Sequence, residues 1–151
     1  SDQLLVTSSG ELLRFMHSKD GMAIKIAIKK GFNVAIISGG TNEGVRSRLE
    51  GLGVTDIYLG VSDKIMTYKK YMNINILDPE NVLYMGDDLS DYILMKQVGL
   101  PCAPQDAIPE IKAISKYVSH KKGGKGCVRD VIEQVLKVQD KWANHFDAKY
   151  D

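Results

Sequence analysis

The chain has 151 residues, enough for one domain with a buried core; 44% of them are hydrophobic and 26% are charged. Lysine plus arginine (20) nearly balances aspartate plus glutamate (19), so nothing in the charge points to a nucleic acid or an anionic membrane as partner. No apolar run is long enough to span a bilayer, and Cys102 and Cys127 match no metal or redox spacing. We therefore expect a soluble cytoplasmic protein.

The first part of the chain predicts a β-hairpin followed by a helix. Two β-prone runs, residues 3–7 and 11–15, lie on either side of Gly10, which can adopt the left-handed backbone of a hairpin loop. Asp20 then opens a helical pattern that ends at Gly31, a typical C-terminal cap.

From residue 33 onward, strand and helix patterns alternate. The apolar run 33–37 predicts a strand buried on both faces, and Thr41 or Asn42 can cap the next helix. The later elements are a strand at 57–59, a helix capped by Ser62 and running to about 71, a strand at 82–85, a helix at 89–98, a short strand at 102–103, a helix at 108–114, a strand at 117–119 and a long helix from 127. This order predicts an α/β, Rossmann-like three-layer sandwich with a mostly parallel sheet.

Three carboxylates follow the strand at 82–85 within six positions. Gly86 breaks the strand, and Asp87, Asp88 and Asp91 come next. Ligands bind beyond the carboxyl ends of strands in open α/β sheets, and gathered carboxylates favour a hard cation such as Mg²⁺. The same residues also suit a helix start, with Asp88 as the cap and Asp91 in the first turn. The local pattern leaves both interpretations open.

Two other strand ends carry groups that suit an anion. Ser38 ends the strand at 33–37, and Lys64 follows the strand at 57–59. Each has an ordinary alternative, since Ser38 could belong only to a tight turn and Lys64 could be an exposed lysine. A hydroxyl, an ammonium and carboxylates at one edge of a sheet could together hold a phosphoryl group and Mg²⁺.

This order of residues resembles the haloacid dehalogenase superfamily. Over essentially the whole chain, up to about Leu136, the sequence is similar to the cap-less KDO 8-phosphate phosphatase-like family, which acts on 2-keto-3-deoxy sugar acid phosphates. The segments that carry the resemblance are Gly10-Glu11, Lys19-Asp20-Gly21, Ile37-Ser38-Gly39, Leu52-Gly53-Val54, Asp63-Lys64, Tyr84-Met85-Gly86-Asp87-Asp88, Val98-Gly99-Leu100 and Gly123-Gly124-Lys125-Gly126.

The resemblance implies a role for each matching residue. Asp87 and Asp91 fall at the metal site, with Asp87 as the Mg²⁺ ligand and Asp91, like Asp88, holding that ligand and Lys64 in place. Ser38, Lys64 and Asp88 fall in the catalytic group, where Ser38 and Lys64 bind the phosphoryl oxygens. The residues that match substrate-binding positions are His17, Ser18, Lys19, Asp20, Gly21, Lys25, Gly39 and Arg48.

The implied activity is Mg²⁺-dependent hydrolysis of a phosphorylated sugar acid through an aspartyl-phosphate. KDO 8-phosphate is the first expectation and a nonulosonate 9-phosphate the second, with a setting in lipopolysaccharide biosynthesis. The resemblance also implies a projecting N-terminal β-hairpin and a homotetramer in which this hairpin closes a neighbouring subunit's site. The alternative is a catalytically silent domain that serves in oligomer assembly, as in CMP-sialic acid synthetases.

The sequence departs from the family pattern at two places. Many relatives carry a basic residue where this chain has Gly40, and Arg46 could compensate. The nucleophile segment D-x-D-G-V-L, expected just before Ser1, is absent together with its strand, which is central in the family's sheet. We therefore expect one domain over residues 1–151, with a frayed tail at 144–151, in a polypeptide that extends upstream by roughly 15–30 residues.

Overall fold

The predicted alternation of strands and helices is present throughout residues 3–142, the part of the chain that the computed structural model describes. The strands are β1 (Leu5–Val6), β2 (Leu12–Leu13), β3 (Ala35–Ile37), β4 (Asp56–Tyr58), β5 (Leu83–Met85), β6 (Leu100–Ala103) and β7 (Tyr117–Val118). The α-helices are α1 (Ser18–Lys29), α2 (Glu43–Gly51), α3 (Lys64–Asn75), α4 (Tyr92–Met95), α5 (Pro109–Ile114) and α6 (Cys127–Val138), and two 3-10 turns are η1 (Pro79–Asn81) and η2 (Leu89–Asp91).

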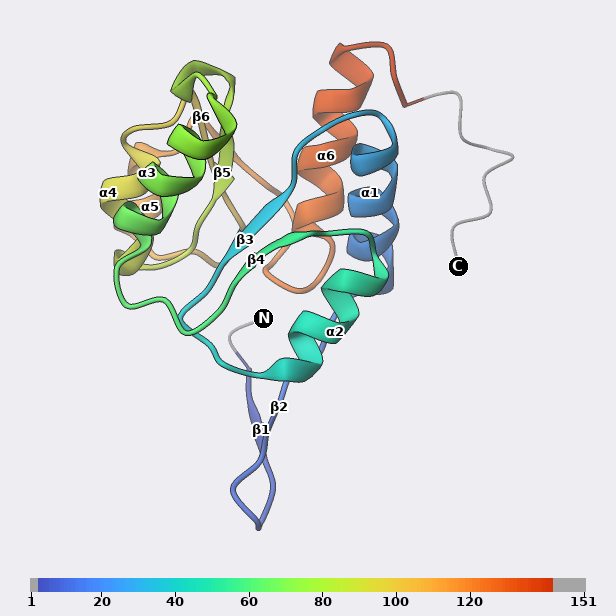
Figure 1. The fold of residues 1–151 in the computed structure, drawn as a ribbon, viewed down its shortest axis with the longest axis vertical. Helices are drawn as coiled ribbons and strands as arrows, with labels where there is room; N and C mark the ends of the chain where they lie inside the picture. Colours follow the sequence, from blue (N-terminus) through green and yellow to red (C-terminus); the bar gives the residue numbers. More distant parts are fainter. Residues whose placement is uncertain (1–2, 143–151) are drawn as a thin grey trace.

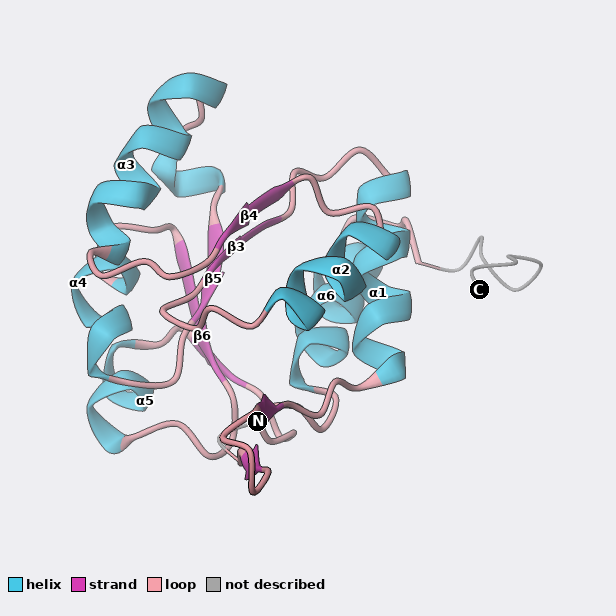
Figure 2. Ribbon diagram, turned by 60° about the horizontal axis from the view of Figure 1, so that its bottom comes forward, coloured by secondary structure: helices cyan, strands magenta, loops and turns pink. Residues whose placement is uncertain are grey.

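The elements form three layers, as predicted. In Figure 2, α3, α4 and α5 lie on one side of the strands, and α1, α2 and α6 lie on the other. The predicted tail at 144–151 lies outside the described residues. Within them, no helix is both long and apolar enough to cross a membrane.

The parallel sheet is present in two pieces. Strand β3 pairs with β4, with Ile36 opposite Ile57, and β5, β6 and β7 form a second parallel set. Among the described residues, β3 has no partner besides β4, and β5 has none besides β6. Alternate residues of a parallel strand direct their backbone groups to opposite edges. Each of these two strands therefore keeps one edge that no described strand covers, on which backbone N–H and C=O groups need a partner.

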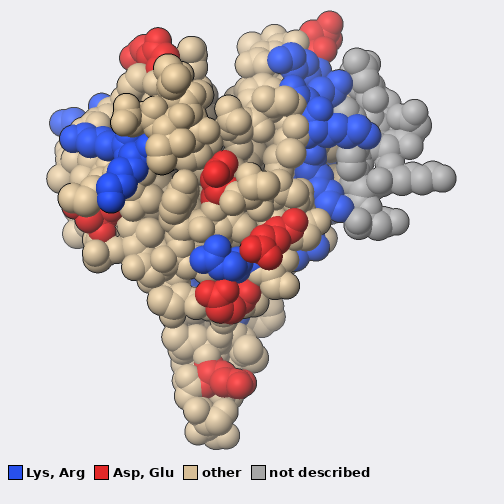
Figure 3. All heavy atoms as spheres, in the orientation of Figure 1, with Lys and Arg blue, Asp and Glu red and all other residues tan. Residues whose placement is uncertain are grey.

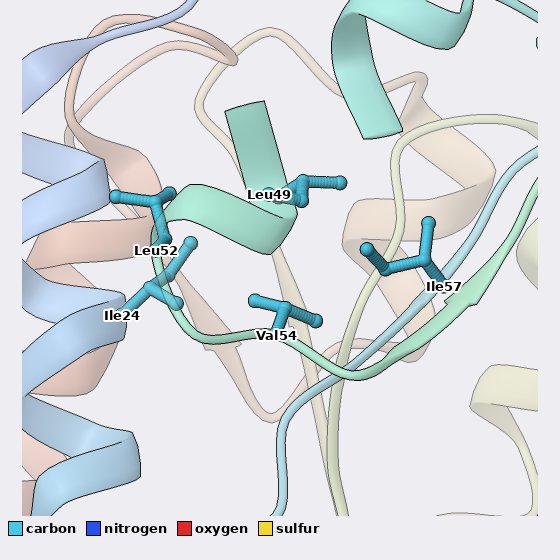
Figure 4. Packing of buried hydrophobic residues seen from close by; sticks show 5 residues of the cluster. All are labelled: Ile24, Leu49, Leu52, Val54 and Ile57. Atoms are coloured by element: carbon cyan, nitrogen blue, oxygen red, sulfur yellow. The ribbon is translucent and has the colours of Figure 1, made fainter. Parts of the chain in front are cut away.

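The two pieces share the helix layer formed by α3 and α4. One apolar cluster joins β3 and β5 through these helices, and its buried centre is Tyr68, Tyr71, Met72, Leu94 and Val98. A second cluster lies under α1 and α2, where Ile24, Leu49, Leu52, Val54 and Ile57 pack together (Figure 4). Burial of such aliphatic side chains stabilises a fold by about 1.5–3 kcal/mol each, so these clusters fix the helices against the strands.

The N-terminal hairpin projects from the body of the molecule, as predicted (Figure 1). Strands β1 and β2 pair antiparallel with Leu5 opposite Leu13, and Gly10 adopts a φ of 84° in the loop. Both strands are shorter than the predicted runs, and their apolar side chains are exposed. Phe15, which follows β2, is 66% exposed. On the face shown in Figure 3, the surface of the hairpin is mostly uncharged.

Several predicted boundaries are wrong. Asp63 rather than Ser62 caps α3, because its carboxylate accepts the Met66 N–H at 3.1 Å. Helix α1 begins at Ser18, two residues before the predicted start. The predicted helix at 89–98 divides into η2 and the short α4, which ends at Met95. Strand β3 is half-buried rather than fully buried, which is consistent with its open edge.

Candidate active site at the carboxyl ends of β3, β4 and β5

The loops after β3 and β4 are hydrogen-bonded to each other. The Val61 N–H donates to the Ser38 carbonyl at 3.0 Å, and the Gly60 N–H donates to the Gly40 carbonyl at 2.9 Å. The Ser38 hydroxyl also accepts the Gly40 N–H at 3.1 Å. These bonds hold Ser38 beside the loop that leads into α3, whose first residue is Lys64.

Asp91 lies at the centre of the cluster that follows β5, and only 2% of its surface is exposed. One carboxylate oxygen, Oδ1, accepts hydrogen bonds from Lys64 Nζ at 2.7 Å and from Tyr84 Oη at 2.7 Å. The other, Oδ2, accepts the backbone N–H groups of Asp87 at 3.0 Å and Asp88 at 3.3 Å. A carboxylate has about four lone-pair sites, so this arrangement leaves none for a cation. These contacts hold Lys64 Nζ and the backbone of Asp87 and Asp88 against the Asp91 carboxylate.

The electrostatics of the cluster keep Asp91 ionised. Burial raises the pKa of Asp91, but the hydrogen bonds from Lys64 and Tyr84 favour the charged form and hold its pKa below the ordinary value. The pKa of Tyr84 is raised, first by burial and then by the neighbouring Asp91 charge. At neutral pH the Asp91 carboxyl is therefore ionised and the Tyr84 phenol is neutral.

The loop between β5 and η2 is tightly packed. A Cβ at Gly86 would lie 2.5 Å from Asp91 Cβ and 2.8 Å from Met95 Sδ, so only glycine fits there. Asp88 caps η2 by accepting the Leu89 N–H at 2.7 Å and forms a capping box with Asp91. The Asp87 carbonyl accepts the Ile108 N–H at 3.1 Å. The capping interpretation of Asp88 is thus confirmed, and it is compatible with a site beside it.

The donor set of this loop suits Mg²⁺ better than a transition metal. Among the described residues, no group of three or more histidine, cysteine, aspartate or glutamate side chains could hold a metal ion. Mg²⁺ is commonly bound by only one or two carboxylates together with waters and substrate phosphate oxygens. Asp87, half-buried beyond the end of β5, and the exposed Asp88 are carboxylates of this kind.

The segment from His17 to Gly21 forms the start of α1, and its members differ in environment. His17 is the N-cap residue, while Ser18 and Lys19 are exposed in the first turn. Asp20 is buried, and its Oδ1 accepts the Arg129 N–H at 2.9 Å. That N–H lies in the first turn of α6, whose own N-cap, Gly126, has no side chain. Asp20 therefore caps a helix that starts more than a hundred residues further along the chain.

Two other predicted substrate-binding residues lie next to each other. A Cβ at Gly21 would lie 3.0 Å from the Arg48 Nη2, so glycine at this position lets the guanidinium approach α1. Lys25 lies one turn further along α1 and is half-buried. Gly39 is exposed in the loop after β3, with the Val61 carbonyl 3.5 Å from the position of a Cβ.

Sequence reasoning missed Tyr84 and placed Arg46 incorrectly. Tyr84 was named only as a strand residue and as part of a matching segment, with no role in the site. Its hydrogen bond to Asp91 joins β5 to η2, and the sequence has no local signal for such a bond. Arg46 is engaged elsewhere, because it donates to Glu43 Oε2 at 3.0 Å and to the Ile57 carbonyl at 3.2 Å. It is therefore not positioned to compensate for Gly40.

The fold is a three-layer α/β arrangement with polar groups gathered at the carboxyl ends of its strands, and comparisons with known proteins identify its family. A family model described as haloacid dehalogenase-like hydrolase matches residues 53–132. The 3-deoxy-D-manno-octulosonate 8-phosphate phosphatase of Yersinia pestis is 39% identical over 142 residues, covering 93% of this chain and 76% of the relative. The corresponding phosphatase of Salmonella typhi is 37% identical with the same coverage.

Solved structures give the same result. The crystal structure of the Yersinia pestis phosphatase superposes with a TM-score of 0.91 at 37% identity, covering 94% of this chain and 77% of that one. The Moraxella catarrhalis phosphatase, solved with magnesium, phosphate and KDO, superposes with a TM-score of 0.89 at 28% identity, covering 93% and 80%. The chain belongs to the 3-deoxy-D-manno-octulosonate 8-phosphate phosphatase family of haloacid dehalogenase-like hydrolases. It is accordingly a phosphoric monoester hydrolase.

Proposed function

We propose that this protein is a Mg²⁺-dependent phosphatase of 2-keto-3-deoxy sugar acid phosphates, with KDO 8-phosphate as the first candidate and a nonulosonate 9-phosphate as the second. The observation that carries the proposal is the Lys64–Asp91 ion pair of 2.7 Å. It holds an ammonium group near the loop that carries Asp87, next to the edge where Ser38 lies. Relatives that share 37–39% of their residues with this chain bear the name of that activity.

Each residue of the cluster has a distinct task in this proposal. Lys64 and the Ser38 hydroxyl bind the phosphoryl oxygens and stabilise the charge that develops during transfer. Asp87 is the ligand of Mg²⁺, which when bound supplies further positive charge to the phosphoryl oxygens. Asp88 fixes the turn after Asp87, and Asp91 prevents Lys64 from turning away.

The attacking group in this proposal is an aspartate upstream of Ser1, on a strand that pairs between β3 and β5. The open edges of these two strands support that placement, since both need a partner for their backbone groups. The aspartate forms a phosphoenzyme, and a second aspartate two residues later acts as general acid and then as general base.

The remaining substrate contacts and the assembly belong to the same proposal. His17 to Gly21, Lys25, Gly39 and Arg48 bind the sugar acid, with Asp20 acting through its cap on α6. The exposed apolar side chains of the hairpin, among them Leu5 and Phe15, support a homotetramer in which the hairpin covers a neighbour's site. Such a phosphatase works in the cytoplasm, in lipopolysaccharide biosynthesis.

A substrate panel tests this function. The full-length protein is assayed with Mg²⁺ against KDO 8-phosphate, a nonulosonate 9-phosphate and simple sugar phosphates, and we expect kcat/KM to be highest for the first. The Asp87→Asn variant should lose about 10³-fold in kcat, because Lewis-acid stabilisation of the phosphoryl group is worth several kcal/mol. Its melting temperature should match that of the parent protein.

An inactive parent protein, or an Asp87→Asn variant with unchanged turnover, would refute the proposal. Release of phosphate without any preference for 2-keto-3-deoxy acids would keep the phosphatase class but remove the substrate assignment. Inactivity combined with a stable tetramer would favour the catalytically silent assembly domain.

A further inference from the structure

Arg14 lies near Ser38, and the proposed function gives it no role. It is exposed and follows β2 at the base of the hairpin. A Cβ at Gly40 would lie 3.4 Å from Arg14 Nη2 and 3.5 Å from Ser38 Oγ. The guanidinium and the hydroxyl thus border the same small volume beyond the carboxyl end of β3.

Asn42, in the loop between β3 and α2, connects the hairpin to that loop. Its Nδ2 donates to the Leu12 carbonyl at 2.6 Å, while its Oδ1 caps α2 by accepting the Gly44 N–H at 2.8 Å. A single side chain therefore ties the base of the hairpin to the start of α2. Because Arg14 is only two residues beyond Leu12, its backbone has a fixed position relative to Ser38.

The guanidinium of Arg14 has no acidic partner among residues 3–142. Arg46, in contrast, is held by Glu43 and by the Ile57 carbonyl. The absence of a side chain at Gly40 leaves the space that the Arg14 guanidinium borders. A guanidinium without an acidic partner, beside the Ser38 hydroxyl and next to a glycine, suits an anion supplied by a ligand.

We propose that Arg14 is a substrate-binding residue that receives an oxyanion of the substrate in its own subunit, with Gly40 leaving room for it. This inference rests on the proposed function, because a phosphorylated sugar acid brings two such groups, a carboxylate and a phosphoryl group. Both match the planar fork of a guanidinium, which can donate two parallel hydrogen bonds. The hairpin thus contributes a charge to the site of its own chain.

Calorimetric titration of the full-length protein in Mg²⁺ separates the two sources of the oxyanion. The unphosphorylated octulosonate and inorganic phosphate are titrated separately into the parent protein and into the Arg14→Gln, Arg14→Lys and Arg46→Gln variants. We expect Arg14→Gln to weaken one of the two ligands by at least about 10-fold, the effect of losing a hydrogen bond to a charged group. Arg14→Lys should retain part of the affinity, and Arg46→Gln should match the parent.

Each outcome decides the inference. Selective loss of octulosonate affinity assigns Arg14 to the carboxylate, and selective loss of phosphate affinity assigns it to the phosphoryl group. Unchanged affinity for both ligands, an equal loss in Arg46→Gln, or no binding of either ligand to the parent would overturn the inference. Turnover of the phosphate ester is measured separately, so Arg14-dependent binding in a protein without turnover refutes the proposed function and keeps this assignment.

Discussion

Two buried aspartates of this protein use similar partners for different purposes. Asp91 is 2% exposed and Asp130 is 7% exposed, and each accepts a hydrogen bond from a tyrosine, Tyr84 at 2.7 Å and Tyr117 at 2.8 Å. In both, burial raises the pKa, but hydrogen bonds outweigh it and hold the carboxyl pKa below the ordinary value. The difference between the two lies in the other donors.

Asp91 has a charged donor, whereas the closest donors of Asp130 are neutral. Lys64 pairs with Asp91 at 2.7 Å, but Asp130 accepts hydrogen bonds from the hydroxyls of Ser119 at 2.7 Å and of Tyr117. His120 approaches Asp130 only to 3.7 Å, on the exposed side. The first arrangement places a cation at the carboxyl edge of the sheet, and the second fastens α6 to the end of β7. We therefore expect the ion pair to support the proposed site and the neutral hydrogen bonds to support the fold.

The strongest test of this comparison is Asp91→Asn. Removal of the charge leaves Lys64 beside an uncharged amide in a poorly solvated site, so we expect the free energy of unfolding to fall by about 3 kcal/mol. Lys64 and the loop of Asp87 also lose their anchor, which should reduce kcat/KM by about 10- to 100-fold. Urea unfolding and steady-state kinetics measure the two effects. Loss of stability with unchanged kcat/KM would mean that the cluster serves only the fold.

Gly86→Ala tests the same cluster without changing any charge. The added methyl group would lie 2.5 Å from Asp91 Cβ and 2.7 Å from Asp91 Cγ, so the carboxylate must shift. Overpacking of this kind costs about 1–3 kcal/mol, and we expect kcat to fall together with stability. Gly51→Ala is a matched control, because nothing lies within 4 Å of a Cβ at that position in α2. A tolerated Gly86→Ala would show that the loop can move without cost.

Asp130→Asn should affect stability alone. The amide can replace only part of the hydrogen bonding, so we expect a loss of about 1.5–3 kcal/mol in unfolding free energy and unchanged kcat/KM. Because the folded pKa of Asp130 is depressed, its stabilisation is present above the unfolded pKa of about 3.9 and disappears as pH falls through the lower, folded pKa. The stability difference between the variant and its parent should therefore shrink below about pH 4. A difference that persists there would exclude the ionised carboxylate as its source.

Much of this site was predictable from the sequence because its residues follow recognisable strand ends. The apolar run before Gly86, and the positions of Ser38 and Lys64 after their strands, place all three at one edge of a parallel sheet. Local patterns also offer Thr41 or Asn42 as the cap of α2, and the structure shows that Asn42 is the cap. Two adjacent residues that can both cap a helix are harder to tell apart. The sequence therefore predicted Ser62 as the N-cap of α3, where the structure has Asp63.

The contacts that were not predictable join residues far apart in the sequence. Asp20 caps α6 by way of Arg129, and Arg14 reaches Gly40 from the hairpin. Hydrophobic periodicity gives the type of an element and its buried face, but it does not say which polar side chain meets which distant backbone group. Such pairings depend on how the helices pack, and only the structure gives them.

The smallest expected effects come from the two tyrosines that donate hydrogen bonds to Asp91 and Asp130. Tyr84→Phe and Tyr117→Phe each remove one hydroxyl that donates to a buried carboxylate, so both should lose about 1.5 kcal/mol in unfolding free energy. Only Tyr84→Phe should also alter catalysis, by a factor of a few in kcat, because Asp91 then holds Lys64 less rigidly. Chemical denaturation and steady-state kinetics on both variants give the comparison. Equal kinetics in the two variants would mean that Lys64 and the backbone donors of Asp87 and Asp88 hold Asp91 without help from Tyr84.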